Sequence, residues 1–304
     1  MEGKRNALFI NSLESSSDII CIQEHWLYEF QKQSLCNVLP NTDMFLRCSD
    51  TYEEISNFNR PRVKGGVAIA WKRFLTPSIS EIPSGNNRII AIELKSPMKI
   101  CIICVYMPTN NSGDSYLEYT ECLDVISSIL SMYSVSHRIL IVGDCNGTLK
   151  PPRKYNKHDF LLQVFVHEMN LQSHRSEEST FFHHSGMSTS QIDYILHNAT
   201  IAFLSNYKIH DQCHSNTSSH VSVIAKMNVK SKPTNKSIKS GYVSKFKIQW
   251  KDIDSETYHN YISNELSQHN IESPSIEESI NFLCNCPNTL PFLLQLLFHQ
   301  RLSN

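Results

Sequence analysis

Residues 139–147 read ILIVGDCNG, a short apolar run that ends in small and polar residues. Four consecutive branched aliphatic side chains are typical of a strand that is buried on both faces. Helical spacing precedes this run over Tyr116–Tyr133, where apolar residues recur at intervals of three, four and six. A helix that leads into a buried strand predicts an α/β arrangement in which helices cover a sheet.

Other short runs rich in Ile and Val are bounded by Asp, Asn, Gly or Pro, which is the pattern of β-strands. These expected strands are Ile19–Gln23, Val67–Trp71, Ile89–Leu94, Ile100–Tyr106, Gln191–Leu196 and His220–Met227. Consecutive strands between Val67 and Tyr106 favour an antiparallel meander, and a second helical pattern covers His158–Met169. Both patterns in one chain predict mixed sheets, or a two-sheet sandwich, with outer helices.

The composition is that of a globular intracellular protein. Of 304 residues, 40% are hydrophobic and 19% charged, which allows a sizeable core. The formal net charge of −1 excludes a globally basic coat for nucleic acid. No stretch reaches the roughly 18 apolar residues of a membrane span, and no secretory signal is present. Ten cysteines, several inside apolar runs, indicate reduced thiols. We expect an intracellular location without a membrane, the nucleus being one candidate.

The charge pattern changes near residue 226. Residues 226–251 contain eight lysines and no acidic residue, together with Pro233 and Gly241. This composition predicts a folded domain over residues 1–227, a basic linker over 228–251 and a separate C-terminal part over 252–304. The lysines could also bind phosphates of a nucleic acid, and both interpretations stay open.

Polar side chains stand at the ends of several expected strands. Each has a structural explanation as a turn, cap or satisfied core residue. Because strand ends of a packed sheet converge in space, the group taken together predicts one site. Its members are Glu24, Tyr106, Asp144, Asn146, Asp193 and His220.

The same residues carry a resemblance to a known family. Six short motifs occur in a fixed order: QE (Gln23-Glu24), GGVAI (Gly65–Ile69), VYMP (Val105–Pro108), GDCN (Gly143–Asn146), SQIDYI (Ser190–Ile195) and SH (Ser219-His220). The set resembles the endonuclease/exonuclease/phosphatase superfamily, and within it the apurinic-type endonuclease domain of non-LTR (LINE-like) retrotransposons. Lys247–Ile262 is similar to the connector that precedes the reverse transcriptase in such elements.

The resemblance implies a four-layer α/β/β/α sandwich that hydrolyses a phosphodiester of DNA with Mg²⁺, or Mn²⁺ in its place. A divalent ion neutralises charge that builds on the phosphoryl oxygens, and Mg²⁺ prefers oxygen ligands. By this resemblance, Glu24 is a metal ligand, Asp144 positions or deprotonates the attacking water, and Asn146 orients that water. His220 donates a hydrogen bond to a phosphate oxygen, and Asp193 supports the His220 ring. Tyr106 contacts the phosphate.

Two departures from the family pattern predict weak or lost activity. The chain opens in a helical pattern at Lys4–Leu13, so the family's first strand, with its Asn near the metal, is expected to be missing. Ser219 stands where the family usually has Asp, and a hydroxyl cannot supply that negative charge. Both indicate a truncated or decaying copy.

Three functions stay open. The first is a Mg²⁺-dependent DNA endonuclease of retrotransposon origin, impaired by these departures. The second is a catalytically dead remnant that at most binds nucleic acid. The third is a phosphodiesterase or phosphatase that acts on another substrate, against which the connector-like segment argues. The sequence carries no signal for the oligomeric state.

Overall fold

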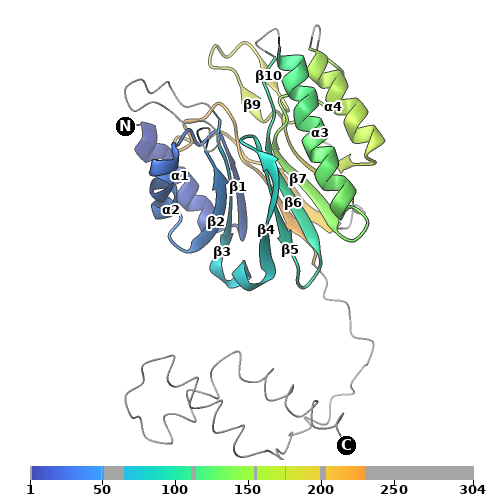
Figure 1. Ribbon diagram of the computed structural model, residues 1–304. Coiled ribbons are helices and arrows are strands. Elements are labelled where there is room, and N and C mark those ends of the chain that lie inside the picture. The colour runs from blue at the N-terminus through green and yellow to red at the C-terminus, as the bar shows by residue number, and fades with distance from the viewer. Residues whose placement is uncertain are drawn as a thin grey trace, which may run out of the picture. The chain divides into compact units, whose positions relative to one another are not determined.

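The computed structural model describes residues 2–48, 50, 65–110, 114–153, 156–174, 176–198 and 203–229. The chain divides into two units, Met1–Thr234 and Asn235–Asn304, and the described residues all belong to the first. The expected linker beyond residue 229 and the C-terminal part over 252–304 lie outside the described residues. In the first unit, two sheets face each other and helices cover their outer faces (Figure 1). This is the expected α/β/β/α arrangement.

The larger sheet has six strands in the order β4-β5-β6-β7-β11-β8. Only β6 and β7 run parallel, and every other neighbouring pair is antiparallel. All seven residues of β6 are buried, which explains its unbroken apolar sequence. The strands are β4 (Ile79–Asn86), β5 (Ile89–Leu94), β6 (Ile100–Tyr106), β7 (Arg138–Asp144), β8 (Gln172–Ser173) and β11 (Asp193–His197).

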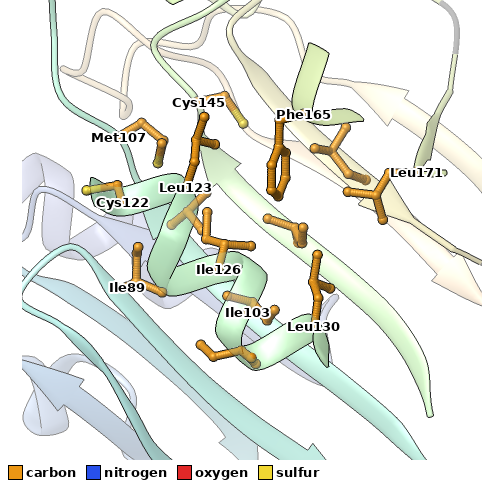
Figure 2. Close-up of a cluster of buried hydrophobic side chains, with 14 of the residues drawn as sticks. Ile89, Ile103, Met107, Cys122, Leu123, Ile126, Leu130, Cys145, Phe165 and Leu171 are labelled. Atoms are coloured by element: carbon orange, nitrogen blue, oxygen red, sulfur yellow. The ribbon is translucent and has the colours of Figure 1, made fainter. Parts of the chain in front are cut away.

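Two helices cover the outer face of this sheet, α3 (Ser115–Tyr133) and α4 (Lys157–Glu168). Leu123, Ile126 and Leu130 of α3 pack together with Phe165 and with sheet residues such as Ile103 (Figure 2). The Asn156 side chain caps α4 by accepting a hydrogen bond of 3.0 Å from the backbone N–H of His158. This cluster forms the core on the helical side of the larger sheet.

The smaller sheet has the order β1-β3-β2, all antiparallel. Its strands are β1 (Ile19–Gln23), β2 (Thr42–Arg47) and β3 (Val67–Lys72), and the segments beside it are α1 (Glu2–Glu14), α2 (Lys32–Val38) and the 3₁₀ turns η1 (Glu29–Gln31) and η2 (Arg73–Ser78). A second hydrophobic cluster fills the space between the two sheets, with Val67, Ile69 and Trp71 of β3 against Ile102 and Cys104 of β6.

Two further antiparallel pairs complete the described part of the fold. They are β9 (Phe181–Phe182) with β10 (Thr189–Ser190), and β12 (Leu204–Ile209) with β13 (Val223–Met227). Among the described residues, β1 pairs only with β3 and β13 only with β12, so each has one edge without a strand partner.

The expected helices and strands are present, and two of the strand boundaries shift by more than one residue. β11 begins at Asp193 and not at Gln191, because the backbone of Ile192 bonds instead to the Thr180 side chain and to Cys145. β13 begins at Val223, and His220 forms an isolated bridge with Phe181. Asp193 is thus the first residue of β11, whereas His220 lies outside the regular strands. None of the helices in the described ranges is long and apolar enough to cross a membrane.

Candidate active site

Strand register aligns three of the six predicted residues. Tyr106 at the end of β6 lies opposite Asp144 at the end of β7, and Asp144 lies opposite Asp193 at the start of β11. Residues directly opposite each other on neighbouring strands share a face of the sheet. The three side chains therefore form a row along one edge of the larger sheet.

Gly143 lets β6 and β7 approach each other next to Asp144. Its φ of 139° is a conformation that residues with a side chain rarely adopt. A Cβ atom at this position would overlap the carbonyl oxygen of Val105 and crowd the Gln23 amide. The glycine thus fixes the end of β7 from which Asp144 projects.

Gly143→Ala is expected to lower the free energy of unfolding by about 2–4 kcal/mol, because a backbone oxygen cannot move aside as a flexible side chain can. Gly186→Ala is the matched control, since Gly186 also has a positive φ of 70° but no atom lies within 4 Å of the place that its Cβ atom would take. It should cost about 1 kcal/mol. Urea unfolding of both variants measures the difference, and equal losses would contradict the close approach.

Asp144 is buried and held by Asn146. The backbone N–H of Asn146 donates to Asp144 Oδ1 at 2.9 Å, and its amide Nδ2 donates to Oδ2 at 3.2 Å. The same Nδ2 donates to the carbonyl of Met107 at 2.7 Å. Asn146 has a φ of 45°, which Asn tolerates better than most residues. The amide of Asn146 therefore positions the Asp144 carboxylate.

His220 contacts two of the three carboxylates at the site. Its Nδ1 lies 3.0 Å and 3.2 Å from the two carboxylate oxygens of Asp193, within hydrogen-bonding distance. Its Nε2 lies 4.0 Å from Asp144 Oδ2. The Phe181 ring packs beside the imidazole at 4.9 Å between centroids. Asp193 thus orients the ring so that Nε2 faces the Asp144 side of the site.

Burial and charge set the protonation of this pair. Burial by itself lowers the pKa of His220, but the hydrogen bond and charge of Asp193, with the charge of Asp144, raise it to about 9. Burial and the charge of Asp193 raise the pKa of Asp144 to about 8, and His220 opposes that rise. The site therefore holds a cationic imidazole and a buried carboxyl that is costly to ionise.

Asp193→Asn should lower the pKa of His220 toward its ordinary value of 6.5, because it removes the negative charge and the anionic acceptor. An NMR titration in the presence of a chelator measures the pKa of the His220 imidazole. The His220 signal is the one that disappears in His220→Ala. Since the folded-state pKa is raised, the pair stabilises the wild-type fold fully below about pH 6.5 and loses this effect as the pH rises through about 9. An unchanged titration in Asp193→Asn would contradict the assigned contact.

Glu24 and Tyr106 form the other side of the site. Glu24 is exposed, follows β1 directly and accepts a hydrogen bond from the Tyr106 hydroxyl. Burial, followed by the hydrogen bond and charge of Glu24, raises the pKa of Tyr106 well above its usual value. The phenol therefore stays protonated and holds the Glu24 carboxylate in place.

The donor set fits a hard divalent cation. Asp144, Asp193 and His220 offer ligand atoms that all lie within 4.8 Å of one another. A protonated imidazole is not a ligand, so carboxylate oxygens remain, which are the ligands that Mg²⁺ prefers. Glu24, the predicted metal ligand, is not in this compact group, but its accessible carboxylate is held by Tyr106, which lies opposite Asp144. A cation here would also relieve the charge that raises the pKa of Asp144.

Thr180 supports the site and has no signal in the sequence. Its buried hydroxyl accepts hydrogen bonds from the backbone N–H groups of Ile192 at 3.0 Å and Asp193 at 3.1 Å. Its carbonyl accepts one of 2.8 Å from Val221, the residue after His220. Thr180 thereby ties the segments that carry Asp193 and His220. A lone Thr in a polar loop sequence gives no indication of such long-range contacts.

Comparison of the sequence with models of protein families assigns the chain to a family. The model of the endonuclease/exonuclease/phosphatase family matches residues 4–220, more than half of the chain. The chain belongs to the endonuclease/exonuclease/phosphatase family. All six predicted site residues lie within the matched range. No curated protein sequence matches the chain.

Solved structures of this family share the fold. The endonuclease domain of TRAS1, a telomere-specific non-LTR retrotransposon, has a TM-score of 0.53 at 14% identity, over 74% of this chain and 92% of that one. The 3′ phosphatase NExo from Neisseria, solved with a product DNA hairpin, has a TM-score of 0.56 at 14% identity, over 73% and 94%. An AP endonuclease from Archaeoglobus fulgidus has a TM-score of 0.55 at 14% identity, over 74% and 95%.

Proposed function

We propose that this protein hydrolyses phosphodiester bonds of DNA with Mg²⁺, as an endonuclease of retrotransposon origin whose activity is weakened by Ser219. The observation that carries the proposal is the junction of Asp144, Asp193 and His220, where a cationic imidazole faces a buried carboxyl of raised pKa. Strongly shifted pKa values that arise from burial and specific charge partners are typical of catalytic sites.

Each side chain has a role that follows from its contacts. The pKa of Asp144, raised to about 8, lies close to neutral pH, which suits a base that takes a proton from the attacking water. His220 donates its Nε2 proton to a phosphoryl oxygen, and Asp193 keeps the ring oriented and cationic. Asn146 positions Asp144, and Tyr106 holds Glu24.

The metal site of the proposal uses oxygen donors. Glu24 would hold the ion, since its carboxylate is accessible and fixed by Tyr106, and Tyr106 lies opposite Asp144 in the row of strand ends. When bound, a divalent ion neutralises charge on the phosphoryl oxygens during attack. Mg²⁺ keeps several waters, so one or two carboxylates suffice.

DNA is the proposed substrate because two lines of similarity agree. The ordered motifs resemble retrotransposon endonucleases, and the TRAS1 endonuclease domain shares the fold. NExo, which shares it too, was solved with a DNA hairpin. The basic stretch over residues 226–251 offers phosphate-binding lysines, which makes DNA a better partner than an uncharged substrate.

The experiment is nicking of a supercoiled plasmid by the full chain with Mg²⁺, with Mn²⁺ and with chelator. We expect slow nicking with either ion and none with chelator, and His220→Ala should abolish it. His167→Ala is the matched control, because this exposed histidine lies in the last turn of α4. Nicking that persists in chelator, or in His220→Ala, would contradict the proposal.

A second candidate function is DNA binding without cleavage, which Ser219 favours because it removes a negative charge next to His220. One series of binding and cleavage assays distinguishes the two candidate functions. Binding of a fluorescent duplex that is never followed by cleavage in Mg²⁺ or Mn²⁺, even after Ser219→Asp, would support the binding protein. Cleavage by either chain would support the nuclease.

A further inference from the structure

A second cluster of polar side chains lies at the other end of the larger sheet. His137 directly precedes β7 and Asp144 ends that strand, so about 20 Å of extended chain separates His137 from the candidate active site. The cluster joins Ser136 and His137 to Glu93 of β5. It therefore takes no part in the site described above.

The three side chains form a continuous chain of hydrogen bonds. The Ser136 hydroxyl lies 2.8 Å from His137 Nδ1, and His137 Nε2 lies 2.9 Å from Glu93 Oε1. An ionised carboxylate only accepts hydrogen bonds, so Nε2 carries a proton and donates it to Glu93. In the neutral ring, Nδ1 is then the acceptor, and the Ser136 hydroxyl donates to it. This is the order of nucleophile, base and orienting carboxylate that activates a hydroxyl.

The exposure of the three side chains suits these roles. The His137 side chain is 6% exposed and that of Glu93 is 19% exposed, so their contact is largely shielded from water. The Tyr133 and His137 rings pack in a T-shaped arrangement, with 5.0 Å between their centroids. Ser136, by contrast, is exposed. The base is thus held in place while the hydroxyl remains open to a substrate.

The end of α3 favours the charge that this base acquires. α3 ends at Tyr133, and the backbone N–H groups of Ser136 and His137 donate to the Tyr133 carbonyl at 3.1 Å and 2.9 Å. The C-terminus of a helix carries a partial negative charge, which stabilises a cation next to it. That end and the Glu93 carboxylate both stabilise the imidazolium that forms when His137 takes the proton of Ser136.

We propose that Ser136, His137 and Glu93 form a second hydrolytic site, which cleaves carboxylic esters with a short acyl group. Val135, which is 96% exposed directly before Ser136, offers the acyl group an apolar contact. The inference goes beyond the proposed function and does not depend on it.

The reaction has two steps. Ser136 Oγ attacks the ester carbonyl while His137 Nδ1 takes the hydroxyl proton, and the bond from the acyl carbon to the alcohol oxygen breaks as the alcohol leaves with that proton. Water then attacks the acyl-serine, and Nδ1 takes a proton from the water and returns it to Ser136 Oγ as the carboxylic acid leaves. The serine is restored, and one water is consumed for each ester.

A fluorophosphonate probe tests the nucleophile, because it reacts preferentially with activated serines and releases fluoride. Peptide mass spectrometry of the labelled full chain should find the probe on Ser136. Ser185 is the internal control: its hydroxyl lies 2.7 Å from His183 Nδ1, but among the described residues no carboxylate bonds to that histidine. Equal labelling of Ser185, or an unlabelled Ser136, would overturn the proposal.

Hydrolysis of p-nitrophenyl acetate measures the roles of the partners. His137→Gln should lower kcat by at least about 10², the usual contribution of a general base. Glu93→Gln should lower kcat at least about tenfold and leave KM unchanged, because Glu93 positions the ring and does not touch the ester. Ser136→Ala should remove the activity, whereas Ser134→Ala, at an exposed serine that caps α3, should keep it. Equal kcat in Ser136→Ala and the wild-type chain would overturn the site, whether or not the buried His137 variant folds.

Discussion

Asp144→Asn is expected to reduce the rate of Mg²⁺-dependent DNA cleavage by at least about 10³. The substitution keeps the shape of the side chain but removes the base for the attacking water and the charge beside the metal. Asp124→Asn serves as the control, because Asp124 is an exposed carboxylate of α3. Initial rates of plasmid nicking at equal protein concentration measure the effect.

The same substitution should stabilise the fold at alkaline pH. The raised pKa of Asp144 means that the folded state binds its proton more tightly than the unfolded state, so this group costs stability progressively as the pH rises from about 3.8 to about 8. Asn cannot ionise, and the penalty disappears. A rise in melting temperature at pH 9 together with loss of cleavage identifies a residue that serves function at the expense of stability. A large drop in both would instead mean that Asn146 and Asp144 serve the fold.

Ser219→Asp is expected to raise the rate of cleavage by about 10². It adds a negative charge directly before His220, where the resembling endonucleases carry an Asp, and this favours both the bound cation and the protonated imidazole. Ser215→Asp adds the same charge to an exposed position of the same loop and should change the rate little. Initial rates of plasmid nicking by the wild-type chain, Ser219→Asp and Ser215→Asp measure the effect. A gain in Ser215→Asp as large as that in Ser219→Asp would assign the effect to general charge.

The buried strands could be predicted from the sequence because their apolar runs have a simple physical cause. β6 and β7 are covered on both faces, by helices on one side and by the smaller sheet on the other, so almost every position in them is apolar. Edge elements such as β12 (LSNYKI) mix polar and apolar residues and leave no such pattern. The polar residues at the ends of these apolar runs could be predicted as site candidates because they stand out against the apolar positions before them.

The supporting contacts of the site could not be predicted. The row of Tyr106, Asp144 and Asp193 depends on strand register, which a single sequence does not fix. Thr180 acts through residues far away in the chain, and nothing in its own surroundings marks it. Gly66 belongs to the GGVAI motif, but its contact with the His25 ring does not follow from the motif. The left-handed backbone at Glu24 and Trp26 likewise contradicts local preference, because the anchored His25 imposes it.

The most direct measurement of the central claim is cleavage of supercoiled plasmid by Ser219→Asp beside the double variant Ser219→Asp, His220→Ala, each with Mg²⁺ and with chelator. If Asp144, Asp193 and His220 form a phosphodiester-hydrolysing site, the first protein cuts only with the metal and the second is reduced by at least about 10². A folded Ser219→Asp chain that leaves the plasmid intact, or a double variant that cuts at the same rate, would contradict the account.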